Sequence, residues 1–272
     1  MTEGDMTTNN PYSHYLELAK KAAEIGREVL MSYYGRLRNV EEKRDAGLVS
    51  EADKESEDRI REFLAKETPD FEFLGEEGGL TKTETQAKGR WICDPLDGTT
   101  NYIHQFPFFC VSVALEFEGK MVAGVIDVPV YQQIYEATRG GGSYLNGEKL
   151  QVSDIDSLTE GLFVTGFSYK RGEELNQQAK AFLRLMQDAR GVRRTGSAAM
   201  DLCLVASGVF DGYWEKYLKP WDTAAAALIV QEAGGTVTDF QGNSYDPFAL
   251  EVIASGPKVH GKLMDVLNSQ GD

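Results

Sequence analysis

The sequence predicts a protein of the mixed α and β class, and three observations support this. Apolar residues recur at helical spacing through the first 66 residues, strand-like runs follow one another between residues 71 and 150, and strands alternate with helices after residue 150. The chain shows no internal repeat, low-complexity tract or long linker. We therefore expect an α+β part over residues 1–150 and an α/β part over residues 151–272, which share a core and form one unit.

Two helices are expected near the start of the chain, after a disordered segment at residues 1–10. The first covers Ser13 to Tyr34, and Gly35 is a suitable residue to end it. The second runs from about Ser50 to Lys66. Ser50 and Asp53 have the spacing of a capping box, in which each side chain accepts a hydrogen bond from the other residue's backbone N–H.

Strands dominate the next part of the chain. The first is expected at residues 71–75 and is followed by a polar, mobile loop over residues 79–89. A hairpin is expected about Glu118-Gly119, and Asn146-Gly147 is a strong signal for a type I′ turn. The strands around these turns are expected at residues 110–117, 120–128 and 133–137.

The last part alternates strands and helices. The helix expected at residues 221–233 is mostly apolar, so we expect it to be buried. The other expected helices cover residues 173–188, 197–207 and a segment after Pro257, and the expected strands cover residues 162–166, 209–214 and short segments near Val237 and Val252.

Charge and composition exclude several classes of function. The formal net charge is −15, from 28 basic and 43 acidic residues. A nucleic-acid-binding surface is basic, so we expect no direct contact with nucleic acid. The longest wholly apolar run, Ala224 to Val230, is far too short to span a membrane, and an odd number of cysteines is typical of a reducing compartment. We expect a cytoplasmic protein that does not enter a membrane.

The stretch from Trp91 to Tyr102 holds the strongest functional signal. A short apolar run ends in Asp94, as a strand would, and Asp97 follows three residues later with the Leu96 carbonyl between them. Two carboxylates and a carbonyl at the end of a strand make an all-oxygen site. Such a site suits Mg²⁺ or Mn²⁺ rather than Zn²⁺.

An anion site is expected directly after these residues. The chain is expected to start a helical turn after Gly98, so the Gly98 and Thr99 amides would point outward and could hold a phosphate. The alternative is a β-turn in which Asp94 caps the backbone while Pro95 and Gly98 set the geometry.

This stretch closely resembles the first signature of the inositol monophosphatase family of Mg²⁺-dependent phosphatases. That signature has an aromatic residue and an aliphatic run before Asp-Pro-aliphatic-Asp-Gly-Thr, and Tyr102 and His104 match the residues that follow it. Cys93 departs from the aliphatic residue usual in the family, but a buried cysteine packs as a small apolar residue. The resemblance spans nearly the whole chain and implies the layered αβαβα sandwich that the family shares with fructose-1,6-bisphosphatase.

A second stretch resembles the family's other signature. Trp221-Asp222 opens the apolar helix, which is closed by Gly234-Gly235. The resemblance implies that Asp222 is a metal ligand, whereas the residues alone also allow it to be the N-cap of that helix. The acid pair Glu76-Glu77 would ordinarily be solvated, but it resembles the family's Gly-Glu-Glu, whose first acid binds metal.

The resemblance implies a metal centre with two or three Mg²⁺ ions per active site, with Mn²⁺ as a substitute. Glu76, Asp94 and the Leu96 carbonyl would hold one ion, and Asp94, Asp97 and Asp222 would hold a second. Paired metals about 4 Å apart can activate a water and stabilise the leaving oxygen in an in-line displacement.

The resemblance also implies the residues that orient the attacking water. These are Glu76 and Thr99, with Asp53 behind Thr99. From the residues alone, the capping box explains Asp53 without any catalytic role.

The implied substrate is a small phosphorylated polyol or sugar. Thr100-Asn101 resembles the inositol monophosphatase branch, since the nucleotide 3′-phosphatase branch tends to carry Lys-Glu there and the histidinol-phosphate branch Arg. Inositol 1-phosphate is the first choice, and fructose 1,6-bisphosphate and NADP(H) stay open. The implied substrate-binding residues are Asp97, Gly98, Thr99, Gly196, Ser197, Ala198 and Glu215.

Two further properties of the family are expected here. A homodimer is its usual form, and its members often lose a metal to Li⁺, which predicts inhibition by lithium. An alternative from another class is a catalytically weak scaffold that binds metal and a protein partner.

Overall fold

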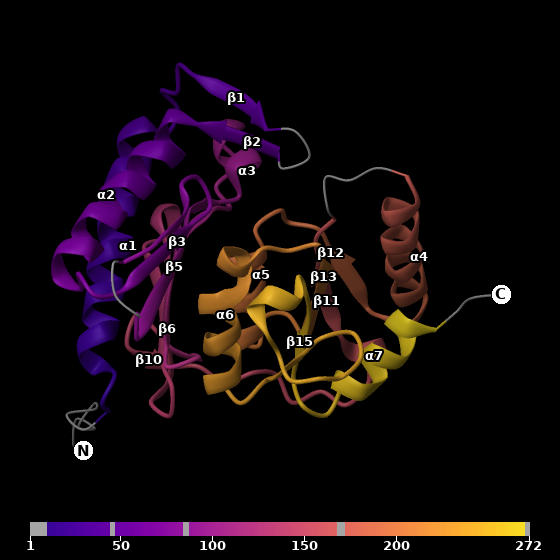
Figure 1. The fold of residues 1–272 in the computed structure, drawn as a ribbon. Coiled ribbons are helices and arrows are strands. Elements are labelled where there is room, and N and C mark those ends of the chain that lie inside the picture. Colours follow the sequence, from indigo (N-terminus) through magenta and orange to yellow (C-terminus); the bar gives the residue numbers. More distant parts are fainter. Residues whose placement is uncertain (1–9, 44–46, 84–86, 168–171, 270–272) are drawn as a thin grey trace.

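The computed structural model of the chain describes residues 10–43, 47–83, 87–167 and 172–269, and these residues form five layers (Figure 1). Helices α1 and α2 cover one face of a first sheet, α5 and α6 lie between this sheet and a second one, and α4 and α7 cover the outer face of the second sheet. The predicted αβαβα sandwich is confirmed. The boundary at residue 150 stays a prediction, and the expected disordered start lies, except for Asn10, outside the described residues.

The first outer layer consists of α1 (Ser13–Tyr33) and α2 (Glu51–Glu67). A two-stranded ribbon, β1 (Val40–Lys43) with β2 (Gly47–Ser50), connects them. The predicted capping box of α2 is confirmed. The Ser50 N–H donates to the Asp53 carboxylate at 2.9 Å, and the Ser50 hydroxyl oxygen accepts from backbone N–H groups of the first turn.

The first sheet has the strand order β10-β9-β8-β7-β6-β5-β3-β4 over the described residues. Strands β3 and β5 run parallel, and the other neighbours are antiparallel. Helices cover both faces, which explains why the central strands are apolar along most of their length. The strands are β3 (Glu72–Gly75), β4 (Gly79–Thr81), β5 (Gly89–Asp97), β6 (Cys110–Phe117), β7 (Lys120–Val128), β8 (Gln133–Thr138), β9 (Gly142–Leu145) and β10 (Glu148–Lys149).

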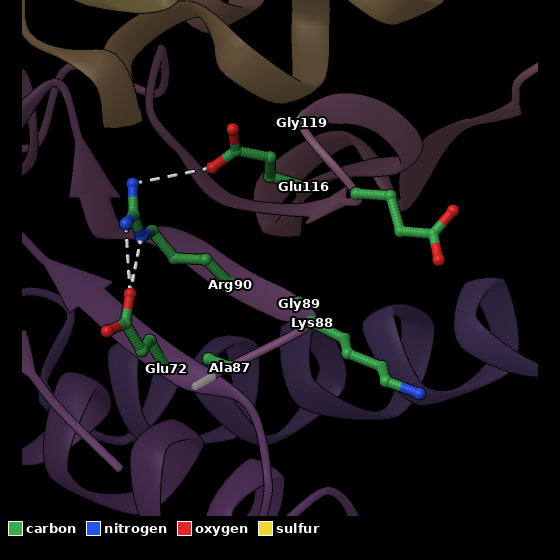
Figure 2. Close-up of a pocket in the computed structure, with 8 residues that line it drawn as sticks. Glu72, Ala87, Lys88, Gly89, Arg90, Glu116 and Gly119 are labelled. Carbon is green, nitrogen blue, oxygen red and sulfur yellow. Dashed lines mark hydrogen bonds and ion pairs between the residues drawn. The ribbon is translucent and has the colours of Figure 1, made fainter. Parts of the chain in front are cut away.

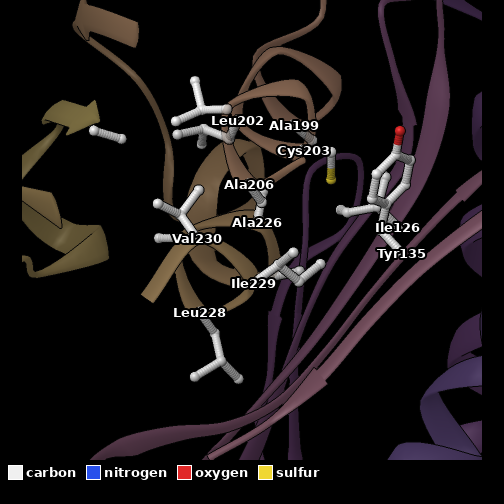
Figure 3. Packing of buried hydrophobic residues seen from close by; sticks show 14 of the residues in the cluster. Ile126, Tyr135, Ala199, Leu202, Cys203, Ala206, Ala226, Leu228, Ile229 and Val230 are labelled. Atoms are coloured by element: carbon white, nitrogen blue, oxygen red, sulfur yellow. The ribbon is translucent and has the colours of Figure 1, made fainter. Parts of the chain in front are cut away.

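The middle layer consists of α5 (Ala198–Ala206) and α6 (Pro220–Glu232), which contact both sheets. Every residue from Ala224 to Val230 is buried, as expected for a helix that is apolar on all sides. Figure 3 shows Cys203 of α5 pointing toward Ile126 and Tyr135 of the first sheet. One continuous core therefore includes the middle layer and the inner face of the first sheet.

The second sheet has the order β12-β11-β13-β15-β14. Strand β11 runs parallel to both of its neighbours, and the remaining pairs are antiparallel. The outer helices α4 (Glu173–Asp188) and α7 (His260–Asn268) cover it through a separate apolar cluster that includes Phe163 and Leu185. The strands are β11 (Leu162–Thr165), β12 (Gly191–Arg193), β13 (Gly212–Lys216), β14 (Thr236–Thr238) and β15 (Glu251–Ser255).

Most expected elements are confirmed. Strands β6 and β7 and helix α4 have the predicted ends. Asn146 and Gly147 have φ values of 49° and 85°, and the type I′ turn requires both to be positive. Among the described helices, none has both the length and the apolar character needed to cross a membrane.

Two expectations are corrected. The loop expected over residues 79–89 contains β4 and the start of β5, and residues 84–86 lie outside the described residues. The strand expected at residues 209–214 begins only at Gly212. Val209 and Phe210 instead donate their backbone N–H groups to the Leu204 carbonyl and close the turn after α5.

Gly124→Ala should destabilise the fold by overpacking the contact between the first sheet and the middle layer. A Cβ at Gly124 in β7 would lie 2.7 Å from the carbonyl oxygen and 3.0 Å from the Cα of Ala225 in α6. Backbone atoms in a packed layer do not move aside easily, so we expect a loss of about 1–3 kcal/mol in the free energy of unfolding. Urea unfolding measures this. Gly261→Ala is the control, because its Cβ would meet nothing within 4 Å, and an equal loss there would contradict the packing explanation.

Candidate active site

Strand β5 ends in an irregular segment that carries Asp94 and Asp97. Asp94 is paired with Ser112 of β6 and Asp97 with Cys110, so β5 has one residue more than β6 over this span. Such a bulge accommodates Pro95, which cannot donate a ladder hydrogen bond. The extra residue also shifts the alternation of side chains, so that residues three apart lie on the same face. The alternative of a β-turn is wrong in its backbone geometry, because the strand continues through Asp97, but its cap is present, because the Asp94 carboxylate accepts from the Leu96 N–H.

Four acids meet at this strand end, and we name them the acid cluster: Glu76, Asp94, Asp97 and Asp222. Asp94 is only 2% exposed, and its Oδ1 accepts from the Leu96 N–H at 2.9 Å. Burial raises the pKa of Asp94 well above its usual range, and the charges of the other three acids raise it further. The structure therefore brings together the four acids that the sequence analysis named as metal ligands.

The carboxylates of the acid cluster do not form a closed coordination shell for a metal ion. Within the described part of the chain, no group of three or more His, Cys, Asp or Glu side chains is arranged so that it could hold a metal ion as it stands. The Oδ2 of Asp97 instead accepts from the Ser197 hydroxyl and the Ala199 N–H, both at 2.7 Å. Burial raises the pKa of Asp97 to about 6, and these hydrogen bonds oppose that effect.

The segment expected to meet substrate, Gly196-Ser197-Ala198, is thus the start of α5 and binds Asp97. Ser197 is the N-cap of α5, and its hydroxyl oxygen accepts from the Met200 N–H at 3.4 Å while its proton goes to Asp97. Gly196 has a φ of 94°, a conformation that favours glycine.

Asp222 lies in the first turn of α6. Its Oδ2 accepts from the Lys219 N–H at 2.6 Å, and Lys219 is the N-cap residue. The alternative that Asp222 is itself the N-cap is wrong, since it lies three residues further along the helix. Burial raises the pKa of Asp222 well above its usual range, and the charge of Asp97 adds to this. The Ser112 hydroxyl donates to the Trp221 carbonyl at 3.2 Å and fixes this end of α6 to β6.

Asp53 contacts both its own capping partner and Thr99. Its Oδ2 accepts from the Ser50 N–H in the capping box, and its Oδ1 lies 3.1 Å from the Thr99 hydroxyl. That hydroxyl is also 3.1 Å from the Leu96 carbonyl oxygen, so its single proton can go to either acceptor. Asp53 is fully buried, and burial raises its pKa to about 6 despite the hydrogen bonds from Ser50 and Thr99.

Gly98 starts the short helix α3 (Thr99–Ile103) and has a φ of 93°. A Cβ at this position would lie 2.9 Å from the Phe108 carbonyl oxygen. The Gly98 N–H also bonds to the Asp97 carboxylate and lowers its pKa. The helical turn expected after Gly98 is confirmed, and its role in holding a phosphate stays a prediction.

Glu215 lies on β13 and is half-buried. The Tyr213 hydroxyl donates to its Oε2 at 2.5 Å, and a Cβ on Gly166 would lie only 1.9 Å from the same oxygen. Burial raises the pKa of Glu215 to about 7, while the Tyr213 hydrogen bond and the Arg194 charge lower it. The charge of Asp97 also raises the pKa of Glu215, so this side chain lies within electrostatic range of the acid cluster.

Two supporting residues were not predicted from the sequence. Asn101 donates from Nδ2 to the Phe108 carbonyl at 2.7 Å and to the Thr195 carbonyl at 3.0 Å, which connects α3 with the loop before α5. Glu57 on α2 is 1% exposed and accepts from the backbone N–H groups that follow Glu76. Its position four residues after Asp53, on the same helix face, was the signal that could have revealed it.

A separate pocket lies at the opposite end of β5 (Figure 2). There Arg90 pairs with Glu72 at 2.9 Å and with Glu116 at 3.4 Å, so its charge is already balanced. At the usual rise of a strand, this pocket is roughly 23 Å from Asp97. It contains none of the candidate catalytic, metal-binding or substrate-binding residues and is not part of the site.

The profile of the inositol monophosphatase family matches residues 12–271, nearly the whole chain. The chain belongs to the inositol monophosphatase family. Membership of the family implies a phosphatase that depends on a divalent metal, Mg²⁺ first of all. The resemblance inferred from the two signatures is confirmed.

Individual relatives agree with this assignment. A fructose-1,6-bisphosphatase/inositol-1-monophosphatase of Aquifex aeolicus is 39% identical over 255 residues, which cover 93% of this chain and 94% of the relative. The Nus factor SuhB of Pseudomonas aeruginosa is 40% identical over 233 residues, covering 84% and 86%. The crystal structure of the extragenic suppressor protein suhB of Bartonella henselae matches with a TM-score of 0.89 and 38% identity, covering 95% of this chain and 100% of that one.

The acid cluster fits the divalent metal that the family implies. Its carboxylates and the Leu96 carbonyl are the hard oxygen donors that Mg²⁺ prefers. The charges of neighbouring acids also raise the pKa values of Asp94 and Asp222, and a bound divalent cation reverses that effect.

Asp53→Asn should change how stability depends on pH. The pKa of Asp53 is raised from 3.8 to about 6 in the folded protein, so between these values the native state keeps a proton that the unfolded state releases. The contribution of Asp53 to stability is therefore full below about pH 4 and is lost as the pH rises through 6, by at most about 3 kcal/mol. Relative to Asp53→Asn, the wild type should become less stable from pH 4 to pH 7.

Urea unfolding in EDTA across this pH range measures the difference. Asp58→Asn, with a side chain 65% exposed on the same helix, is the matched control. A difference between wild type and Asp53→Asn that stays constant with pH would contradict the prediction.

Proposed function

We propose that this protein is a Mg²⁺-dependent phosphomonoesterase that hydrolyses myo-inositol monophosphate to inositol and phosphate. The observation that carries the proposal is the convergence of Asp94, Asp97 and Asp222 with Glu76 at one strand end, where the charges of Glu76 and Asp97 raise the pKa values of both Asp94 and Asp222. A group of buried acids with this coupling is costly unless it binds cations.

The metal would be held by Glu76, Asp94, the Leu96 carbonyl, Asp97 and Asp222, with two or three Mg²⁺ per site and Mn²⁺ as a substitute. When bound, Mg²⁺ supplies positive charge that stabilises the developing charge on the phosphate and leaving oxygens.

The other residues position the substrate and the attacking water. The Gly98 and Thr99 amides would donate to the phosphate at the start of α3, and the Gly98 N–H would then give up its bond to the Asp97 carboxylate. Asp53 would hold the Thr99 hydroxyl so that its oxygen accepts a proton from the water, because Oδ1 of Asp53 can accept the Thr99 proton. Glu76 would orient the same water from the other side.

Substrate choice would depend on the wall formed by β13 and the start of α5. Glu215 and the backbone of residues 196–198 would meet the hydroxyls of the polyol, and Asp97 would lie between them and the phosphate. Fructose 1,6-bisphosphate is the first alternative substrate, since one relative is named for both activities. NADP(H), nucleotide 3′-phosphate and histidinol phosphate are further alternatives.

A second candidate function is a weakly active metal-binding scaffold for a protein partner. Two relatives carry the name Nus factor SuhB, and this name is the reason to consider a scaffold function beside the phosphatase. We also propose a cytoplasmic homodimer without direct nucleic-acid contact.

A panel of inositol, sugar and nucleotide phosphates, assayed with Mg²⁺, with excess EDTA and with added Li⁺, tests the proposal. We expect hydrolysis that is highest for inositol 1-phosphate, requires Mg²⁺ and is inhibited by Li⁺. Full activity in EDTA would overturn the metal-dependent reaction. No hydrolysis of any substrate would favour the scaffold.

Asp97→Asn should remove most turnover while leaving the protein folded. Asparagine keeps one oxygen that can accept from the start of α5, but it removes one charge from the acid cluster. We expect turnover to fall roughly 100-fold or more. Mg²⁺ should raise the melting temperature of the variant less than that of the wild type.

Asp211→Asn is the matched control, because Asp211 is a buried acid that accepts from the Leu162 N–H outside the site. Turnover and Mg²⁺ stabilisation that are the same in wild type and Asp97→Asn would show that Asp97 has only a structural role.

Glu215→Gln should alter substrate preference more than metal dependence. A carboxylate accepts from hydroxyls at both oxygens, whereas an amide accepts at one only. We expect kcat/KM for inositol 1-phosphate to fall roughly tenfold relative to a phosphate ester without ring hydroxyls. Glu251→Gln, on the adjacent strand β15, serves as the control. An equal fall for all substrates would mean that Glu215 does not contact the hydroxyls.

A further inference from the structure

The turn that carries Glu76 is held by a carboxylate from a different element. Glu57 of α2 accepts from the Glu77 N–H at Oε2 and from the Gly78 N–H at Oε1, both at 2.7 Å. Hydrogen bonds to an ionised carboxylate are short and strong, and two successive donors fix the backbone in both position and direction. We propose that Glu57 is a positioning residue that holds the Glu76 turn in place for divalent-metal binding.

The turn is shaped around this carboxylate. A Cβ on Gly75 would lie 2.4 Å from the carboxyl carbon of Glu57, and a Cβ on Gly78 would lie 2.8 Å from its Oε1. Glycines on both sides of Glu76-Glu77 therefore allow the backbone to approach the carboxylate closely. A turn that merely connected β3 to β4 would not require this space.

The charge of Glu57 is partly balanced within the same helix. Arg61, one turn further along α2, lies 3.4 Å from Oε1 of Glu57. Glu57 itself is only 1% exposed, so its two oxygens depend on these partners rather than on water. A glutamine at this position would turn an N–H₂ group toward a backbone N–H, and one of the two backbone bonds would be lost.

Glu57 belongs to a face of α2 that contacts three segments of the site. Asp53 contacts Thr99 at the end of β5, the Ser56 hydroxyl donates to the Pro95 carbonyl at 3.3 Å, and Glu57 binds the Glu76 turn. Residues at spacings of three and four lie on one side of a helix. One rigid helix thus fixes the Glu76 turn relative to the strand that carries Asp94 and Asp97.

Loss of this support should weaken metal binding more than substrate binding. The inference rests on the metal-dependent function proposed above, and it concerns only the residues that hold a ligand in place. Substitutions of groups that orient metal ligands typically lower metal affinity 10- to 100-fold. We therefore expect the dissociation constant for a divalent metal to rise at least tenfold in Glu57→Gln, with the KM for substrate at saturating metal unchanged within a factor of two.

The experiment measures Mn²⁺ binding directly, by electron paramagnetic resonance of the free ion, for wild type, Glu57→Gln and Glu62→Gln. Glu62 is exposed on the same helix, so Glu62→Gln is a control that makes the same chemical change outside the contact. A tenfold rise in the Mn²⁺ dissociation constant in Glu57→Gln alone, measured at a temperature at which circular dichroism in EDTA shows all three proteins folded, supports the inference. Equal Mn²⁺ binding in all three proteins overturns it, and so does a parallel weakening in Glu62→Gln.

Gly78→Ala tests the same contact from the side of the turn, and it replaces Glu57→Gln if that variant does not fold. Its Cβ would press on Oε1 of Glu57 and on Nη1 of Arg61, both 2.8 Å away. We expect weaker Mn²⁺ binding, and an effect in the double variant that is less than the sum of the two single effects. Wild-type Mn²⁺ binding in Gly78→Ala, or fully additive effects, overturns the inference. A wild type that neither binds Mn²⁺ nor hydrolyses phosphate esters would instead overturn the proposed function.

Discussion

The hydrogen bonds between Asp97 and the start of α5 are the contact on which the site depends. They join residues about 100 positions apart and connect the end of β5 with the middle layer. The partial positive charge at a helix N-terminus stabilises a carboxylate whose other neighbours are acidic. Helix α6 reaches the same place with its own first turn, through Asp222. Both helices of the middle layer therefore begin at the acid cluster, and the packing of two sheets against them decides how the acids lie.

The electrostatics of the site oppose folding. Burial raises the pKa values of Asp53, Asp94, Asp97, Asp222 and Glu215, so the folded interior disfavours the charged form of each of these acids. The apolar layers on either side offset this, with one core cluster under the outer helices and another around α5 and α6. Stability and the capacity to bind cations are thus supplied by different parts of the molecule.

Structural features that local sequence patterns encode were predicted, and features that depend on contacts between distant residues were missed. The amphipathic spacing of α1, the turn residues of the β6–β7 hairpin and the capping box at Ser50 each act within a few residues, and each was predicted. The bulge at Pro95 needs knowledge of the partner strand, and the bond from Asp97 to Ser197 needs knowledge of the fold. Glu57 was missed for the same reason, because its spacing from Asp53 indicates only a shared helix face, and its role depends on partners at residues 77 and 78. Strands β1 and β12 are short, and their pairing rather than their composition defines them.

The alanines at 224–227 have a consequence beyond core packing. All four are fully buried between the sheets, and the backbone of Ala225 lies against Gly124 of β7 without room for a methyl group. Their small side chains determine how far the two sheets stand apart. Asp222 lies in the first turn of this helix, whereas Asp94 belongs to the sheet on which the helix lies, so the thickness of the middle layer sets the span between them. Side-chain size in the buried part of α6 therefore sets the distance between two acids of the cluster that lie at its edge.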